Sequence, residues 1–389
     1  MSDKLSTTVS RRDALKTAAV LGAGMMAFPY VMRGQDGGDN KLIRIGLVGC
    51  GGRGRGAVNQ ALSVPDSNVK LVAISDAFEK QMTDVPKLLA KHGDKVDLPP
   101  ERCFAGLDGY KKVLEHCDLV ILATPPGFRP MHFAAAVAAG KHVFMEKPVC
   151  VDAEGARLVL EAARVADTKG LKIAVGLQRR YEKAYLEAYK RVKDGEIGEI
   201  IQGNVYWNGS GIWWRKREEG MTDFMAQVNN WYHFNYLCGD HICEQHVHNI
   251  DVANWFIGEN PISAFGVGGR RMIDPKQPSE IFDHFAVNLI YANGASVASQ
   301  CRQYPGKDRV SEDFRGTKGS LDIGKTVTIK DRQGNVTWKF EGKSPNPYQE
   351  EHNVLQDCIR KNIPHNDAHY GANSTFSAVL ARYAVYTGK

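Results

Sequence analysis

Paired cysteines are the first feature that this sequence lacks. Its 389 residues contain eight cysteines, but no two of them form a Cys-x-x-Cys pair. This excludes the paired-cysteine patterns of zinc ribbons and of thioredoxin-like redox motifs. We therefore expect mostly free, buried thiols, including Cys50, which stands inside a glycine-rich loop.

The sequence also has no membrane-length apolar run, no long run of one charge sign, and no internal repeat or low-complexity tract. Its formal net charge is only +6 and the charged residues are dispersed, so no nucleic-acid-binding stripe is indicated. Hydrophobic residues make up 43% and charged residues 24%, which is typical of a soluble globular protein. The length favours two domains.

Residues 1–40 are set apart from the fold by a different pattern. Arg11 and Arg12 precede a weakly hydrophobic run over residues 17–28, which is too short to span a bilayer. The pattern resembles a twin-arginine export signal, although Ala14 stands where such signals usually carry a large apolar residue. We expect export to the periplasm or cell envelope. The alternatives are an uncleaved anchor and a merely basic N-terminus.

A glycine-rich loop follows the first expected strand, residues 42–48. Its spacing, Gly49-x-Gly51-x-x-Gly54, is typical of a strand that turns into a dinucleotide-binding helix. Gly49 permits a tight turn, Gly51 leaves room for a pyrophosphate, and Gly54 lets the helix pack closely with its positive N-terminus toward phosphate. We expect all three, together with Gly52, to bind the cofactor.

Asp76 ends the second expected strand, residues 69–74 followed by Ser75. It stands about 22 residues beyond Gly54, where a carboxylate would accept hydrogen bonds from the ribose hydroxyls of NAD. Asp76 therefore favours NAD over NADP, although a neighbouring basic residue could still admit the phosphorylated cofactor. The structural alternative is an aspartate that serves only a turn at the strand end.

Strands and helices continue to alternate beyond this point. Residues 118–123 and 142–145 read as apolar strands, with an alanine-rich helix over residues 131–140 between them. Such alternation predicts a doubly wound parallel sheet. Thr124 and Pro125 follow a strand directly, and ligands bind at that edge of such sheets, so we expect both to line the cofactor groove.

Glu146, Lys147 and Pro148 directly follow the strand at residues 142–145. A lysine at the carboxyl end of a central strand can reach the crevice where a nicotinamide lies, and Pro148 forces an abrupt turn, with a cis bond as one option. We expect Glu146 and Lys147 to contact the cofactor, and Lys147 to contact the substrate as well.

Together, four motifs resemble the glucose-fructose oxidoreductase / inositol dehydrogenase family, also called Gfo/Idh/MocA. In chain order they are Gly49-x-Gly51-x-x-Gly54, Ala123-Thr124-Pro125-Pro126, Ala139-Gly140-Lys141-His142-Val143 and Glu146-Lys147-Pro148. The resemblance covers essentially all of residues 41–389. It implies an α/β fold with an N-terminal Rossmann domain. Export, together with a loop that holds the cofactor through backbone contacts, leads us to expect a tightly bound NAD, and we expect assembly into dimers or tetramers.

We place the Rossmann domain at residues 41–178 and an α+β domain for substrate binding and oligomerisation at residues 179–389. From residue 195 onward the expected strands are longer and joined by polar turns, which is typical of an open, mainly antiparallel sheet. A closing helix over residues 373–386 is expected to pack back on the first domain.

Titratable residues concentrate at residues 239–251, which we expect to form one helix capped by Asp240. The resemblance places an acid, a histidine four residues on and an aspartate three further, which Glu244, His248 and Asp251 match. The acid is usually aspartate. By resemblance, His248 is the general acid or base, Lys147 stabilises the substrate oxygen, and Glu244 binds or orients.

A metal centre is the rival interpretation of this helix, because His241, Glu244 and His248 would lie on one face. The usual zinc-enzyme signatures are missing, so we expect no metal. A polar helix with satisfied core histidines is the purely structural alternative.

Substrate contacts are expected from two further segments. Arg179 and Tyr181 follow the last strand of the first domain, at the ligand edge. Trp213, Trp214 and Arg215 belong to an aromatic-rich insertion over residues 207–236, where flat rings suit sugar faces. These tryptophans could equally seal a dimer contact or the core.

These patterns predict an exported NAD(H)-dependent oxidoreductase that transfers hydride at a secondary hydroxyl or ketone of a sugar, glycoside or cyclitol. One alternative keeps the cofactor but is a redox-neutral glycoside hydrolase that oxidises, eliminates, adds water and reduces again. Another is a non-catalytic sugar-binding protein, against which intact Lys147 and His248 argue. The third is the metal-dependent enzyme.

Overall fold

The computed structural model describes residues 41–389, so the twin-arginine pattern lies outside the described residues. The first domain is built on a six-stranded sheet in which all neighbouring strands are parallel, in the order β3-β2-β1-β4-β5-β6. Its strands are β1 Ile43–Val48, β2 Val69–Asp76, β3 Cys103–Ala105, β4 Leu119–Leu122, β5 His142–Met145 and β6 Ile173–Val175. The order reverses between β1 and β4, and ligands bind such sheets at the carboxyl ends of strands flanking that point.

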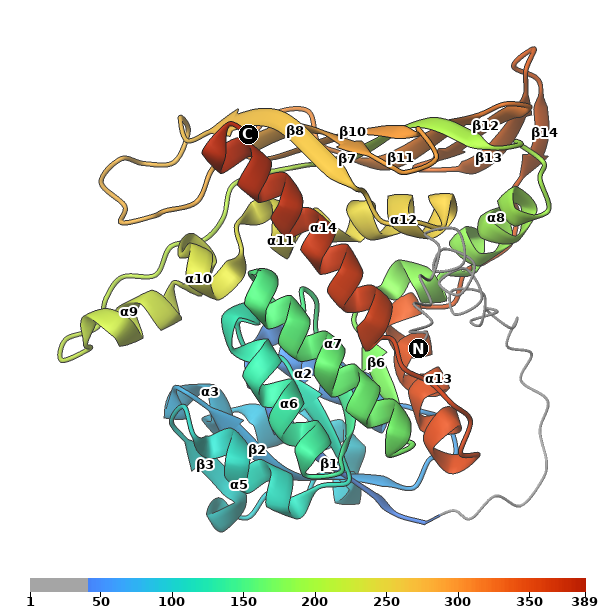
Figure 1. The fold of residues 1–389 in the computed structure, drawn as a ribbon. Helices are drawn as coiled ribbons and strands as arrows, with labels where there is room; N and C mark the ends of the chain where they lie inside the picture. Colours follow the sequence, from blue (N-terminus) through green and yellow to red (C-terminus); the bar gives the residue numbers. More distant parts are fainter. Residues whose placement is uncertain (1–40) are drawn as a thin grey trace, which may run out of the picture. The chain divides into compact units, whose positions relative to one another are not determined.

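Helices cover both faces of this sheet, which explains why its strands are continuous apolar runs (Figure 1). The principal helices of the domain are α2 Gly52–Leu62, α5 Gly109–His116, α6 Arg129–Ala138 and α7 Ala153–Thr168. The apolar side chains form two clusters, one centred on α2 and the other on α5, α6 and α7. This close packing fixes the carboxyl ends of the strands, which the loops with polar residues follow.

The second domain contains an eight-stranded sheet in the order β14-β13-β12-β11-β7-β10-β9-β8. Its strands are β7 Ile200–Gly209, β8 Ser263–Gly269, β9 His284–Ile290, β10 Ser296–Gln303, β11 Arg309–Gly316, β12 Gly319–Ile323, β13 Val327–Asp331 and β14 Val336–Lys339. Only β7 and β10 pair in parallel; the other neighbours are antiparallel. The expected α/β fold with a mainly antiparallel second sheet is confirmed.

Two C-terminal helices return to the first domain. Helix α13 Pro347–Arg360 packs against α2, while α14 Ala368–Thr387 contacts both domains (Figure 1). The first half of α14 packs on α7. The second half of α14 packs on α12 Val247–Ile257 and belongs to the hydrophobic core of the second domain. Within residues 41–389, no helix is both long enough and apolar enough to cross a membrane.

Several elements differ from the sequence-based expectation. The charged residues 79–92 predict one helical segment, whereas the structure has two short helices, α3 Glu79–Thr83 and α4 Val85–Leu88, followed by a 3-10 turn. Pro86 lies at the first turn of α4 and, because it has no backbone N–H, it cannot continue the preceding helix. Helix α8 Lys183–Lys193 and strands β11 and β12 were not expected.

Candidate active site

The glycine loop joins β1 to α2 in a conformation that only glycine tolerates at two positions. Gly49 has a φ of +96°, and a Cβ on it would lie 2.7 Å from the carbonyl carbon of Ala123. A Cβ on Gly54 would overlap the carbonyl oxygen of Gly49. By contrast, a Cβ on Gly51 or Gly52 would meet no atom within 4 Å, because both face a cleft.

The N-terminus of α2 opens into this cleft without a side-chain cap. Gly51 is the N-cap residue, and the first turn carries no acidic side chain. Its amides and the positive end of the helix dipole therefore suit an anion such as a pyrophosphate. The cleft has a volume of about 360 Å³, and its lining includes Gly49, Gly51, Gly52, Asp76, Thr124 and Pro125.

Asp76 is held at the rim of the cleft by two backbone amides. Its carboxylate oxygens accept from Cys50 N at 2.7 Å and Phe78 N at 2.9 Å. These bonds fix the carboxylate beside the glycine loop, where NAD places its ribose hydroxyls in such folds. The residues present therefore fit a dinucleotide, and Arg55 also lines the cleft near Asp76.

We expect the protein to bind NADH at least about tenfold more tightly than NADPH, because the 2′-phosphate would lie beside the Asp76 carboxylate. Asp76→Ala removes this negative charge and should bring the affinities for NADH and NADPH closer together, because Arg55 can then bind the 2′-phosphate without an opposing carboxylate. Titration of both nucleotides by fluorescence measures the ratio in each protein. Tighter binding of NADPH by the wild type would contradict the assignment.

Lys147 follows β5, and the Lys147–Pro148 peptide bond is cis, one of the options expected for it. The Lys147 ammonium donates to the backbone carbonyl of Glu244 and lies 3.3 Å from Glu244 Oε1. The two side chains are only 11% and 9% exposed. Burial raises the pKa of Glu244, and the nearby Lys147 charge opposes this shift. The second domain thus brings its acid to the lysine of the first domain.

The prediction of a single helix over residues 239–251 is wrong. The structure has α11 His241–Glu244, capped by Asp240 as expected, and then α12, with Gln245 and His246 between them. Regular i to i+4 bonding stops here, because His246 N donates to the carbonyl of His241, one residue further back than in an α-helix. The break leaves the Glu244 carbonyl available to Lys147.

His248 lies at the start of α12 and is 5% exposed. Its ring stacks on Trp207 at 5.6 Å between centroids, and no hydrogen-bond partner for its buried Nδ1 lies within residues 41–389. Burial, followed by the positive charge of Lys147, holds the pKa of His248 well below its usual value. The imidazole is therefore neutral near pH 7 and able to accept a proton.

Three further residues of the predicted site form hydrogen bonds with other side chains of the protein. Arg179 donates to the fully buried Glu312, and Tyr181 donates to Asp367. Asp251, the third member of the motif, accepts from Arg180 at 2.8 Å and from Ser374 at 2.7 Å. The predicted substrate residues Arg179 and Tyr181 therefore both have buried carboxylate partners in the structure.

The aromatic insertion divides between two locations. Trp213 and Arg215 line the same cleft as the glycine loop and Asp76, whereas Trp214 packs edge-on against His233 at 4.8 Å between ring centroids and is not in the lining. The sequence pattern does not single out other lining residues. These include Arg53, Arg55, Gln81, Phe128, Asn229 and Trp231. Arg53 stands inside the glycine motif, and Asn229 and Trp231 belong to the aromatic-rich insertion.

Arg53 joins two buried carboxylates. It donates to Glu146, and its Nη2 atom lies 4.0 Å from Oε2 of Glu351, a fully buried residue of α13. Neither carboxylate oxygen of Glu351 has a hydrogen-bond partner among the described residues. Burial, and secondarily the charge of Glu146, raises the pKa of Glu351 well above its usual value.

We expect Glu351→Gln to gain stability relative to the wild type as the pH rises. The folded protein keeps a proton on Glu351 that the unfolded chain releases above about pH 4.5. The wild type therefore loses free energy of unfolding from that pH up to the folded pKa, whereas glutamine stays neutral. Melting temperatures from pH 5 to 9 should show a growing advantage of about 2–4 °C. If the two melting temperatures differ by the same amount at every pH in this range, Glu351 does not have a raised pKa in the folded protein.

The metal interpretation finds no matching arrangement. Within residues 41–389 no three His, Cys, Asp or Glu side chains are placed to hold a metal ion. His241 is engaged elsewhere, with its Nδ1 atom 3.1 Å from the Tyr232 hydroxyl. The expectation of mostly buried, free thiols is confirmed, because all eight cysteines are unpaired and only Cys103 is partly exposed.

Both domains match models of one protein family. The family model for the oxidoreductase family with an NAD-binding Rossmann fold matches residues 43–176, and that for the GFO/IDH/MocA C-terminal domain matches residues 185–322. Inositol 2-dehydrogenase of Rhizobium meliloti (strain 1021) is 25% identical over 72% of this chain and 74% of its own. That of Burkholderia lata is 29% identical over 63% of this chain, and the match spans 61% of the relative.

Solved structures show the same fold at low sequence identity. Scyllo-inositol dehydrogenase from Lactobacillus casei, with bound NAD(H) and scyllo-inositol, has a TM-score of 0.66 at 22% identity and covers 90% of this chain and 98% of its own. Aldose-aldose oxidoreductase from Caulobacter crescentus has a TM-score of 0.71 at 16% identity, with 90% and 99% covered. With both domains matched by the family models, the chain belongs to the Gfo/Idh/MocA family of NAD-binding oxidoreductases.

Proposed function

We propose that this NAD-dependent oxidoreductase oxidises a secondary hydroxyl of a sugar, glycoside or cyclitol to a ketone, or reduces the ketone. The observation that carries the proposal is the meeting of Lys147 with Glu244, beside the buried, neutral His248. This group lies at the carboxyl edge of β5, and Thr124 and Pro125 at the end of the adjacent β4 line the dinucleotide cleft. The inositol dehydrogenase relatives support the substrate class.

Each residue of the group has a distinct task. His248 accepts the hydroxyl proton as the carbonyl forms, and returns it in the reverse direction. Lys147 donates a hydrogen bond to the same oxygen and stabilises its developing negative charge. Glu244 holds the ammonium in place through its carbonyl and carboxylate. A bound NAD supplies the acceptor for the hydride released from the carbon.

We also propose that NAD is preferred to NADP and stays bound through turnover, and that the protein is exported and assembles into dimers or tetramers. An exported enzyme has no ready supply of fresh nucleotide, so a retained cofactor suits the twin-arginine pattern at Arg11 and Arg12. Replacing both arginines with lysine should keep the protein in the cytoplasm, and fractionation would show this. Light scattering would give the assembly state.

The test of the function begins with protein purified without added nucleotide. We expect it to carry NAD(H) that survives dialysis, and the bound NAD to become reduced when a reactive cyclitol or sugar is added. A panel of free cyclitols, sugars and aryl glycosides would identify the substrate class. Release of an aglycone without any net NADH would instead favour the redox-neutral hydrolase. Protein that binds neither NAD nor NADP would refute the proposal.

A further inference from the structure

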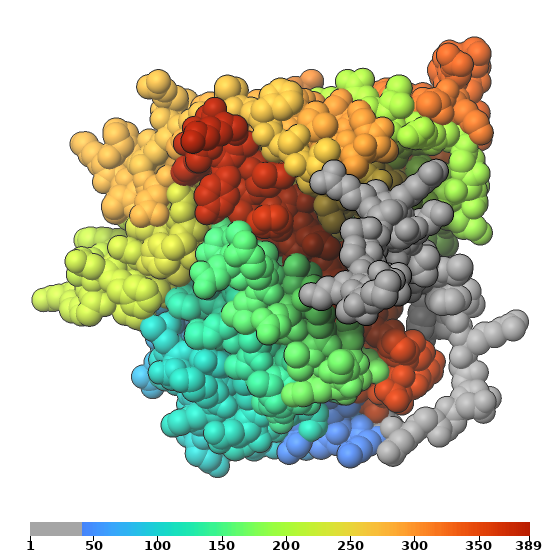
Figure 2. All heavy atoms as spheres, in the orientation of Figure 1, coloured from blue at the N-terminus to red at the C-terminus, as the bar shows by residue number. Residues whose placement is uncertain are grey.

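A segment of the second domain, which we call the strap and define as residues 211–237, forms one wall of the dinucleotide cleft. It leaves the end of β7 and includes α9 Asp223–Asn229, the 3-10 turn Trp231–His233 and most of α10 Asn235–Cys238. Figure 2 shows this yellow-green part of the chain lying against the blue-green first domain. The strap contributes Trp213, Arg215, Val228, Asn229 and Trp231 to the lining of the cleft.

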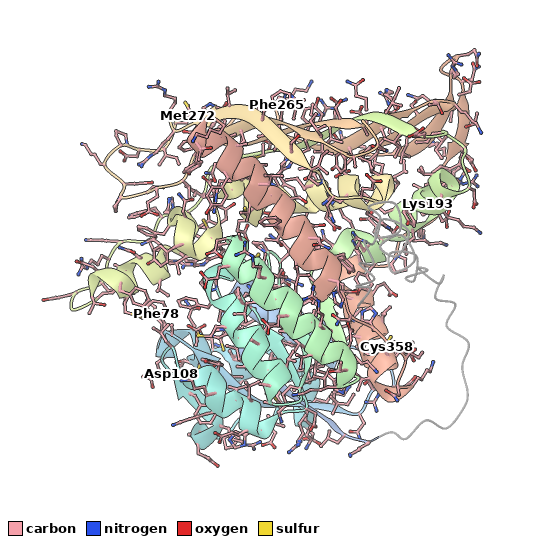
Figure 3. All side chains as sticks on the ribbon, viewed as in Figure 1. Phe78, Asp108, Lys193, Phe265, Met272 and Cys358 are labelled. Atoms are coloured by element: carbon pink, nitrogen blue, oxygen red, sulfur yellow. The ribbon has the colours of Figure 1, made fainter. Side chains whose placement is uncertain are left out.

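The strap is attached to the first domain by a small apolar cluster. Val228, Phe234 and Leu237 of the strap are buried, and Ala77, Phe78, Phe128 and Trp231 pack around them. Ala77 and Phe78 come directly after Asp76, and Figure 3 shows Phe78 at the margin of the first domain below α9. Phe128 lies three residues beyond Pro125. The cluster therefore bridges the loops after β2 and β4, two rims of the cleft.

Close backbone contact reinforces the attachment. A Cβ on Gly127 would overlap the carbonyl oxygen of Tyr236 and lie 3.1 Å from the Cα of Leu237, so α10 lies directly on the loop after β4. On the other rim, Lys80 of α3 forms an ion pair with Glu218 of the strap. A ligand seated between the glycine loop and the strap would therefore be held from both domains.

The strap side chains in the lining suit the adenosine diphosphate half of a dinucleotide. The Arg215 guanidinium carbon lies 4.1 Å from the centroid of the Trp213 ring. Arg215 is fixed at its backbone N by Asn230 Oδ1 and at Nη1 by the Asn229 carbonyl, both at 2.8 Å. Trp213 remains 38% exposed. A flat indole can stack on a purine, and a guanidinium pairs with phosphate oxygens.

We infer that the strap binds the adenosine diphosphate half of NAD, with Arg215 and Trp213 as its contacts, and that it slows release of the cofactor. The inference rests on the proposed function, in which this cleft holds NAD. It assigns these two residues to the cofactor and not to the sugar. Because the strap is held on two rims, its two contacts stay in place beside the bound dinucleotide, which must break them to leave.

The test loads the full-length protein with NADH and follows its release by the loss of NADH fluorescence over time, against an excess of NAD. Arg215→Ala and Trp213→Ala should each accelerate release about tenfold, since each removes a contact to the bound ligand. Lys216→Ala is the matched control, because Lys216 is an exposed cation next to Arg215 and outside the cleft lining. ADP-ribose, which lacks the nicotinamide, should lose affinity in the two variants to the same degree as NADH.

The outcomes separate this inference from the proposed function. NADH release at the wild-type rate in both variants, or an unchanged affinity for ADP-ribose, would overturn the strap as a cofactor contact while leaving the function in place. A wild type that binds no nicotinamide dinucleotide would overturn both. Trp213→Phe keeps a stacking ring and should release NADH within about twofold of the wild-type rate. Melting temperatures confirm that each variant is folded.

Discussion

Lys147→Ala is expected to lower kcat at least about a hundredfold while leaving the fold and NAD(H) binding intact. The lysine ammonium forms an ion pair with Glu244 and lies beside His248. Losing a donor to a developing oxyanion typically costs about a hundredfold to a thousandfold in rate. Because Lys147 lies outside the lining of the dinucleotide cleft, cofactor affinity should change little.

The matched control is Lys141→Ala, which removes a cation from the residue immediately before β5, at the opposite end of that strand. Steady-state kinetics, nucleotide titration and melting curves on both variants separate catalysis from stability. Near-normal turnover in Lys147→Ala would show that the chemistry is carried out elsewhere. If Lys147→Ala loses NADH binding as well as activity, the role of Lys147 is to bind the cofactor and not to catalyse the reaction.

His248→Asn is expected to reduce kcat by about a hundredfold to ten-thousandfold, the range for loss of a general acid or base. Asparagine retains polarity but cannot take up the proton. The low pKa of His248 means that the wild-type rate should stay level as the pH falls through 6.5 and decline only at lower pH. That acid limb should vanish in the variant.

His246→Asn is the comparison for His248. His246 is equally buried, but its Nε2 atom is 2.7 Å from the Ser299 hydroxyl, so it serves the second-domain sheet. Its loss should affect the melting temperature more than kcat. Equal losses of kcat in both variants would mean that disturbance of the break between α11 and α12, and not proton transfer, explains the effect.

The parts of the site that depend on neighbouring residues in the chain could be predicted from the sequence. The glycine loop, Asp76 and the Glu146-Lys147-Pro148 turn each follow a buried apolar strand, so strand order alone brings them to one edge. Glu244 and His248 could be assigned by family resemblance. Their meeting with Lys147 required the packing of two domains, which no local pattern encodes.

The parts that could not be predicted involve polar residues in buried positions. The side chains of Glu312 and Phe314 in strand β11 are buried. Because one of the two is a carboxylate, the strand lacks the alternation of apolar and polar residues that usually identifies a strand in a sequence. Glu312 is tolerated because it accepts from Arg179, from Tyr185 at 3.0 Å and from Asn249 at 2.6 Å. The break in the helix after Glu244 depends similarly on distant partners, Ser299 for His246 and Lys147 for the freed carbonyl.

The most direct test of the proposed hydride transfer uses a substrate deuterated at the carbon that is oxidised. In a single turnover on protein that carries its own NAD, we predict that the deuterium appears on the nicotinamide of the bound cofactor. With a second substrate present, an oxidoreductase should pass the label on, whereas a redox-neutral hydrolase should return it to its own product. Deuterium that is lost to water, or that never leaves the substrate carbon during turnover, would contradict hydride transfer at this site.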